Sequence, residues 1–405
     1  MSWLPEDIPK SNTLPGVRYA TDYWIAVNNF NNRRKVECED LTFMIPFSAD
    51  CEERLLNLLY CLPWIVFNTN AKIHIAIHEK ESNFEGDGWK LFANSRVQGA
   101  ADVINFIKSN PGKLSEVKAS KDFLERFTGN FLLNRFPGAQ PDGQKTYTRA
   151  IGKPMANAQG HSNAIVVPDY NHICLDFLKR TTITYASRGE DEPFHRTRYL
   201  NEMLDKSETK YVANHDADVI LPIKNIESAM SMLRFWDGVA FVYPYDHFEN
   251  GNYQVRVGDH EHVRDRIASA CLSGDLTEVC LSDQCMTWSA AYGQSIFCDA
   301  TFYKATGGEN ENFVSWGAED AERYTRFVKS GALVARCEGG YVLHLEHPRG
   351  PDSSGHNPMF QNNEDLWEKL RSMDGPELIE YYRQCEYLKK YDWNLGEVER
   401  EGEIQ

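Results

Sequence analysis

Two carboxylates, Asp216 and Asp218, bracket one small residue at the end of an apolar run. At the carboxyl end of a strand in a parallel sheet, where such sheets bind ligands, two oxygen donors can hold Mn2+ or Mg2+, and the metal can neutralise a diphosphate. The same spacing occurs twice more, at Glu79/Glu81 and Asp259/Glu261. The preceding strand and the following Pro222 place Asp216 and Asp218 at a strand end rather than on a solvated helix face, which makes them the candidate metal site.

A second group of chemically capable residues is Trp316-Gly-Ala-Glu-Asp320, which follows the Gly307-Gly308 pair. The indole of Trp316 offers a stacking surface for a sugar ring, and the glycines allow a ligand to approach the backbone closely. Asp320, at the start of a predicted helix, can take a proton from an attacking hydroxyl. In the alternative interpretation, Glu319 and Asp320 only complement the helix dipole.

The third candidate is His344, at the end of an apolar strand and three residues before His347. Imidazole is a good Mn2+ ligand, so His344 can complete a metal site that Asp216 and Asp218 begin. The alternative is a structural histidine that is satisfied by its neighbours. The run His260-Glu-His262 has similar chemistry, but no predicted strand presents it.

Alternating strands and helices must position these residues. Residues 41–47 have strand composition, 51–62 form a helix with leucines on one face, and 72–78 alternate as a strand does. This order is a βαβ unit, which requires a right-handed crossover and a parallel sheet. Further strands and helices are predicted at 181–185, 196–206, 211–222, 223–236, 238–243, 319–329 and 340–344.

Two irregular stretches, about 79–180 and 246–296, are interpreted as insertions; whether the first is a lobe or a lid stays open. Residues 1–40 form a polar lead-in, 41–358 form the α/β domain, and 359–405 form a helical extension. The extension is expected to pack on the domain through its apolar positions, Leu366, Trp367, Leu370, Leu378, Tyr381 and Tyr382.

Composition excludes several classes of protein. The 405 residues carry a net charge of −16, which opposes a broad electrostatic grip on nucleic acid. The longest nearly apolar stretch, residues 55–67, contains Asn57 and Pro63 and is too short for a transmembrane segment. Residues 1–10 do not resemble a secretory signal, so a cytoplasmic location is expected. The ten cysteines form no CxxC pair and are expected to be mostly buried thiols.

Taken together and in order, these segments resemble the metal-dependent GT-A glycosyltransferases, and in particular the β-1,4-galactosyltransferase family. Ile45-Pro46-Phe47 is similar to that family's first-strand motif, although Ser48 and Ala49 stand where the family has arginines. Residues 194–201 are similar to a nucleotide-holding segment, and Asp216-Ala-Asp218 to the DxD element. Trp316-Gly-Ala-Glu-Asp320 resembles the family's Trp-Gly-Gly-Glu-Asp signature. The fold implied is a Rossmann-like nucleotide-binding sheet with flanking helices.

The resemblance implies a role for each matching residue. Asp216, Asp218 and His344 would hold the metal, and Asp320 would be the catalytic base. Trp316 and Glu319 would contact the sugar and the acceptor. The residues that would bind the donor are Pro46, Phe47, Phe194, Arg196 and Asp216. His347 and Arg198 are further candidates.

The implied reaction is inverting transfer of a sugar, galactose or N-acetylgalactosamine, from a UDP-sugar to a hydroxyl of a glycan acceptor, with Mn2+ or Mg2+ as cofactor. A single displacement needs only a base and a leaving-group stabiliser, so no covalent nucleophile is expected. Alternatives are a retaining transferase, another nucleotide-sugar donor, or a sugar-binding protein without turnover. A nucleotidyltransferase is disfavoured because no glycine-rich phosphate loop follows the first strand.

Overall fold

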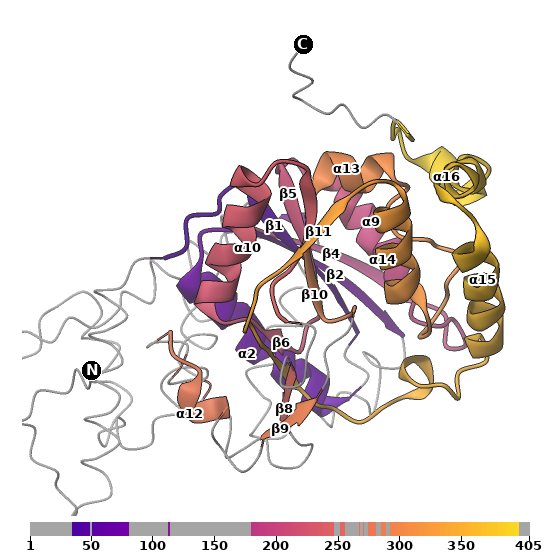
Figure 1. Ribbon diagram of the computed structural model, residues 1–405. Coiled ribbons are helices and arrows are strands. Elements are labelled where there is room, and N and C mark those ends of the chain that lie inside the picture. The colour runs from indigo at the N-terminus through magenta and orange to yellow at the C-terminus, as the bar shows by residue number, and fades with distance from the viewer. Residues whose placement is uncertain are drawn as a thin grey trace, which may run out of the picture.

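The computed structural model describes most of the predicted α/β domain (Figure 1). The described residues are 35–48, 51–80, 112–113, 180–246, 252–255, 267, 270, 274–280, 285–288 and 292–396. Most of the predicted insertion at 79–180, the Asp259/Glu261 pair and the His260-Glu-His262 run lie outside these residues.

An eight-stranded, mostly parallel sheet forms the centre of the fold, in the order β11-β7-β10-β5-β1-β2-β4-β3. Strand β1 pairs in parallel with both β2 and β5, and β2 pairs in parallel with β4. The strand bounds are β1 Leu41–Phe47, β2 Lys72–Lys80, β3 Gly112–Lys113, β4 Thr181–Arg188, β5 Tyr211–His215, β7 Val239–Tyr243, β10 Ser295–Asp299 and β11 Leu333–Arg336. The predicted α/β class with a parallel βαβ unit is therefore confirmed.

Helices cover both faces of this sheet (Figure 1). Helices α2 and α10 lie on one side, whereas α9, α13 and α14 lie on the other. The helix bounds are α2 Glu52–Asn68, α9 Arg196–Lys206, α10 Ile223–Phe235, α12 Thr277–Cys280, α13 Ala300–Ala305, α14 Glu319–Lys329, α15 Phe360–Ser372 and α16 Gly375–Arg383, with 3-10 turns η4 Pro351–Ser353 and η5 Glu386–Lys390. Helix α2 runs past its predicted end at Leu62, because Trp64 and the apolar residues after it are buried in the core.

A small second sheet joins segments that are distant in sequence. Its order is β6-β12-β8-β9, with β6 Val219–Ile220, β8 Asn252–Val255, β9 Cys285–Trp288 and β12 Val342–Leu345. The predicted single strand 211–222 is thus wrong in detail: β5 ends at His215, the chain turns through 216–218, and β6 then joins the other sheet. The turn places the side chains of Asp216 and Asp218 between the two sheets' strands, β5 and β6.

The predicted insertion at 246–296 also needs correction. It contains β8, α12 and β9, and its end overlaps β10, a central strand of the large sheet. Strand β10 is antiparallel to both of its neighbours, β5 and β7. Its residues 295–298 are buried, so this strand is part of the core rather than of a surface loop.

The C-terminal helices α15 and α16 lie beside α14 (Figure 1). Leu370 and Leu378 are buried against Phe313, as the amphipathic pattern predicted. Five cysteines of the described chain are buried as free thiols: Cys38, Cys61, Cys298, Cys337 and Cys385. Among the described helices, none is long and apolar enough to span a membrane.

Candidate functional site

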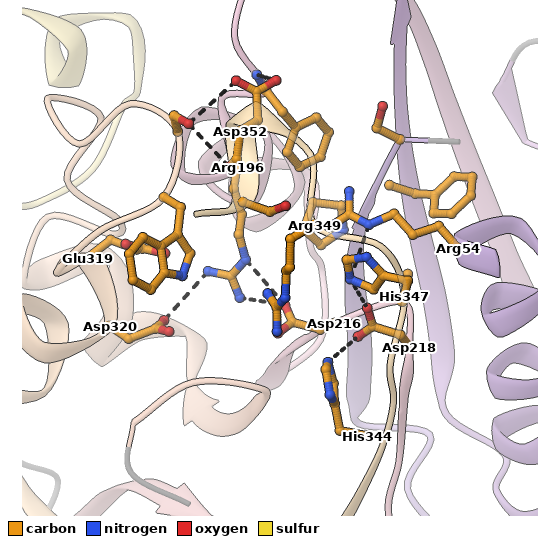
Figure 2. Close-up of a pocket in the computed structure, with 18 residues that line it drawn as sticks. Arg54, Arg196, Asp216, Asp218, Glu319, Asp320, His344, His347, Arg349 and Asp352 are labelled. Atoms are coloured by element: carbon orange, nitrogen blue, oxygen red, sulfur yellow. Dashed lines mark hydrogen bonds and ion pairs between the residues drawn. The ribbon is translucent and has the colours of Figure 1, made fainter. Parts of the chain in front are cut away.

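One pocket opens at the carboxyl ends of β1 and β5, where a parallel sheet binds its ligands (Figure 2). Its empty space, with the open mouth included, is about 870 Å³. It is lined by Pro46, Phe47, Ser48, Arg54, Phe194, Arg196, Asp216, Ala217, Asp218, Ser315, Trp316, Glu319, Asp320, His344, His347, Arg349, Asp352 and Ser353. Every predicted site residue except Arg198 is in this set. Arg198 instead pairs with Glu192 at 3.3 Å.

Asp218, His344 and His347 form a compact, buried cluster with the composition of a metal site. Nε2 of His344 lies 3.6 Å from Oδ1 of Asp218, and Nε2 of His347 lies 3.1 Å from Oδ2. One ligand atom from each residue falls within 4.8 Å of the other two. One carboxylate and two imidazoles suit Mn2+.

Strand pairing explains why residues so distant in sequence meet here. Strand β6 begins directly after Asp218, and His344 in β12 pairs with Val219 in β6. The Leu345 amide also donates to the Asp218 carbonyl, at 2.8 Å. His347 follows β12 and turns back onto Asp218.

Burial and neighbouring charge shift pKa values within the cluster. Burial lowers the pKa of His344, and its Nδ1 is buried without a hydrogen-bond partner. Burial alone would raise the pKa of Asp218, but His344 and His347 hold it well below its usual range. Nδ1 of His347 lies 2.8 Å from the Pro348 carbonyl and donates to it, which fixes the orientation of the ring with Nε2 toward Asp218.

Asp216 lies outside this cluster, although the sequence placed it among the metal ligands. Its Oδ1 accepts hydrogen bonds from Arg196, at 2.8 Å from Nη2 and 3.2 Å from Nε. Arg196 also donates to Oδ1 of Asn214, at 3.0 Å, and pairs with Asp320 at 3.6 Å. The structure therefore places His347, rather than Asp216, beside Asp218 and His344. Asp216 as a metal ligand stays a prediction.

Asp320 lies in the first turn of helix α14, on the opposite wall of the pocket (Figure 2). The loop before it is tightly wound: Ser315, Gly317 and Ala318 have φ values of +64°, +140° and +59°. Non-glycine residues in this region cost energy and cluster at functional sites. The adjacent Glu319 is buried and accepts from the Gly317 amide at 2.9 Å. Burial, reinforced by the charge of Asp320, raises the pKa of Glu319 to about 7.

Trp316 is the exposed aromatic of the pocket, with 43% of its surface accessible. Its ring stacks on Phe360 of α15, with centroids 5.7 Å apart and planes 10° apart. The backbone carbonyl of Trp316 accepts from Asn357 at 2.8 Å. The predicted sugar-stacking residue is thus partly exposed, and its backbone carbonyl is held by a hydrogen bond.

Sequence reasoning missed three charged lining residues. Arg54, in the first turns of α2, donates from Nε to Nε2 of His347 at 3.3 Å, and Arg349 lies two residues after that histidine. Asp352 joins the two walls: it accepts from the Phe194 amide at 3.2 Å, and its carbonyl accepts from Ser315 at 3.2 Å. Arg54 could have been predicted from the sequence, because it lies in the first turn of the helix that follows β1, and ligands bind at that end of a parallel strand.

Comparison with known proteins gives one family match. The family described as the N-terminal domain of galactosyltransferase matches residues 283–348. This segment contains Trp316, Asp320, His344 and His347 but not Asp218. The match supports a glycosyltransferase. No curated protein sequence matches the chain.

Solved structures give weaker likenesses. A mannosyltransferase from Pyrobaculum calidifontis, in complex with GDP-Man and Mn2+, is 10% identical with a TM-score of 0.31, over 91% of this chain and 73% of its own. The catalytic domain of Drosophila β1,4-galactosyltransferase 7, in complex with xylobiose, is 12% identical with a TM-score of 0.35, over 83% of this chain and 82% of its own.

Proposed function

We propose that this chain is a metal-dependent, inverting GT-A glycosyltransferase that transfers a sugar from a UDP-sugar to a glycan hydroxyl. The observation that carries the proposal is a single pocket with two chemically different walls. One wall has the Asp218, His344 and His347 cluster, and the other has Asp320 beside Trp316. The galactosyltransferase match over residues 283–348 supports the same class.

The three residues of the cluster would hold Mn2+ or Mg2+. Their donor set fits the ion, since one carboxylate and two imidazoles offer ligand atoms that lie within 4.8 Å of one another. When bound, the metal supplies positive charge that stabilises the diphosphate as it leaves the sugar. Arg54 and Arg349 line the pocket beside the cluster, where their guanidinium groups can pair with phosphate oxygens.

The opposite wall would activate the acceptor. Asp320 takes the proton of the attacking hydroxyl, while Trp316 stacks against a sugar ring and Glu319 binds a hydroxyl. Phe47 and Phe194 contact the nucleoside, and Arg196 orients the donor. One base facing one leaving-group site is the arrangement of a single displacement, so the product has inverted anomeric configuration. Galactose and N-acetylgalactosamine are the proposed donor sugars.

Calorimetry of the purified chain against UDP-, GDP- and CMP-sugars, with Mn2+ and then with EDTA, tests the proposal. We expect a UDP-sugar to bind with Mn2+ and to lose most of its affinity in EDTA. Preference for a GDP- or CMP-sugar would correct the donor and keep the class. Binding of none of them would contradict the transferase assignment.

A further inference from the structure

Asp320 belongs to a closed ring of polar side chains, of which Arg323 and Glu309 are almost fully buried. Arg323, one turn later on α14, donates to Oδ1 of Asp320 at 2.6 Å and to Oε1 of Glu309 at 2.7 Å. Nδ2 of Asn214 donates to the same Glu309 oxygen at 3.3 Å, and Oδ1 of Asn214 accepts from Arg196. Arg196 closes the ring through its ion pair with Asp320, at 3.6 Å.

Burying the charged members of this ring has a desolvation cost. The side chains of Arg323 and Glu309 are each only 1% exposed, and removing two charges from water costs more than a typical ion pair returns. Tyr303 donates a further short hydrogen bond to Glu309, so the carboxylate is anchored beneath the site. What distinguishes this pair is its contact with Asp320, the ring member that lines the pocket and carries a carboxylate able to accept a proton.

The surroundings of Asp320 fix its carboxylate from both sides. Its Oδ1 is held by Arg323 and Arg196. Its Oδ2 lies against Gly293: a Cβ on that glycine would be only 2.7 Å from Oδ2. The carboxylate therefore has little freedom to rotate, although Asp320 itself is 30% exposed to the pocket.

We infer that Arg323 and Glu309 are positioning residues, which act through Asp320 to hold its carboxylate in the orientation that receives the acceptor proton. This inference rests on the proposed function. The guanidinium group of Arg323 orients the Asp320 carboxylate, and Glu309 neutralises the charge of Arg323. Without Glu309, the buried positive charge of Arg323 would not be neutralised. It would then stabilise the ionised Asp320 carboxylate and make it a weaker proton acceptor.

The test is a double-mutant cycle between Arg323→Lys and Asp320→Asn. Lysine keeps the charge but cannot reach Glu309 and Asp320 together, so we expect kcat to fall by a factor on the order of 10 to 100, with donor affinity unchanged. In the Asp320→Asn background, Arg323→Lys should cause no further loss, because its effect passes through Asp320. Glu309→Gln should behave in the same way.

A matched control lies on the same helix. Arg326 and Glu322 form an equally buried pair at 3.0 Å, which does not touch Asp320. Arg326→Lys should lower the melting temperature as Arg323→Lys does, yet leave kcat near the wild-type value. If Arg323→Lys folds poorly, Gly293→Ala perturbs Asp320 from the other side and should show the same non-additivity.

Losses of kcat that add in the cycle, or that are equal for Arg323→Lys and Arg326→Lys, would overturn the inference while the proposed function stands. A wild-type chain that binds no nucleotide sugar would instead remove the proposed function. In that case, a crystal structure of Arg323→Lys decides: we expect a rotated Asp320 carboxylate, and an unmoved one would overturn the positioning role.

Discussion

Asp216 and Asp218 lie two residues apart but have different partners, so we expect them to have different functions. Asp218 faces two histidines, whereas Asp216 faces Arg196. The alternation of side chains around a turn cannot be read from an acid-x-acid motif, so the sequence alone assigned both to the metal.

Replacing the two aspartates separately tests this division. Asp218→Asn removes the only carboxylate of the described cluster, and we expect calorimetry to show loss of Mn2+ binding and of metal-supported donor binding. Asp216→Asn should retain Mn2+ binding but have a lower affinity for the donor, because Arg196 loses its charged partner. Equal loss of Mn2+ in both variants would show that Asp216 is a ligand after all.

Asp320→Asn should separate binding from chemistry. The amide keeps the shape of the side chain but cannot accept the acceptor proton, so we expect unchanged binding of the donor and loss of turnover by a factor on the order of 100 to 10,000. Single-turnover kinetics with the donor identified by calorimetry measures this. Full activity in Asp320→Asn would show that another group is the base.

Glu319 predicts a pH dependence of stability. Its pKa is raised from 4.5 to about 7, so the folded state binds this proton more tightly than the unfolded chain does. The free energy of unfolding should therefore fall as pH rises from about 4.5 to about 7, by up to roughly 3 kcal/mol. Urea denaturation across this range should show a flatter profile for Glu319→Gln, and an identical slope in both proteins would contradict the assignment.

At the scale of elements, the loop 315–318 has a strained backbone directly before helix α14. Ala318 has a φ of +59°, a conformation that costs a residue with a Cβ about 1 kcal/mol or more. We expect Ala318→Gly to raise the free energy of unfolding by about 0.5 kcal/mol, after the entropy of glycine is subtracted. Ala321→Gly, inside α14, is the control and should lower it by about 1 kcal/mol. Denaturant titrations measure both, and destabilisation by Ala318→Gly would contradict the strain.

How far the sequence predicted the elements depended on how local their signals are. Helix α9 was predicted at its observed bounds because its apolar period is complete within the segment. Strand β10 was missed: five residues with no period of their own become a strand only through pairing with β5 and β7. The sequence offered His347 as a further candidate but could not place it beside Asp218, because that contact depends on the chain turning back after β12.

At the scale of the whole molecule, the C-terminal helices α15 and α16 pack on α14 and are linked to it by a buried hydrogen bond. Tyr382 of α16 donates to Glu322 at 2.7 Å, and Glu322 binds Arg326, whose other hydrogen bonds reach the carbonyls of Thr306 and Gly308. The extension predicted at 359–405 is thereby connected, through Glu322 and Arg326, to the backbone at residues 306–308.

Tyr382→Phe tests this connection. The substitution removes the hydroxyl from a buried charged network, so we expect the free energy of unfolding to fall by about 1–3 kcal/mol in denaturant titrations. Tyr381→Phe is the control, because the Tyr381 hydroxyl bonds Asn312 at an exposed position and should cost much less. Equal effects of the two variants would show that the α16 contact carries no special weight.

The place of β10 in the sheet sets an order of events during synthesis. Strands β5 and β7 have no bond to each other and are joined only when residues 295–299 emerge. A nascent chain that ends earlier leaves one edge of β5 open and both edges of β7, whose other neighbour β11 also comes later. His344 and His347 emerge later still, which means that metal can recognise only a nearly finished fold. We expect the ion to act late, as a lock on the completed protein rather than as a nucleus of its folding.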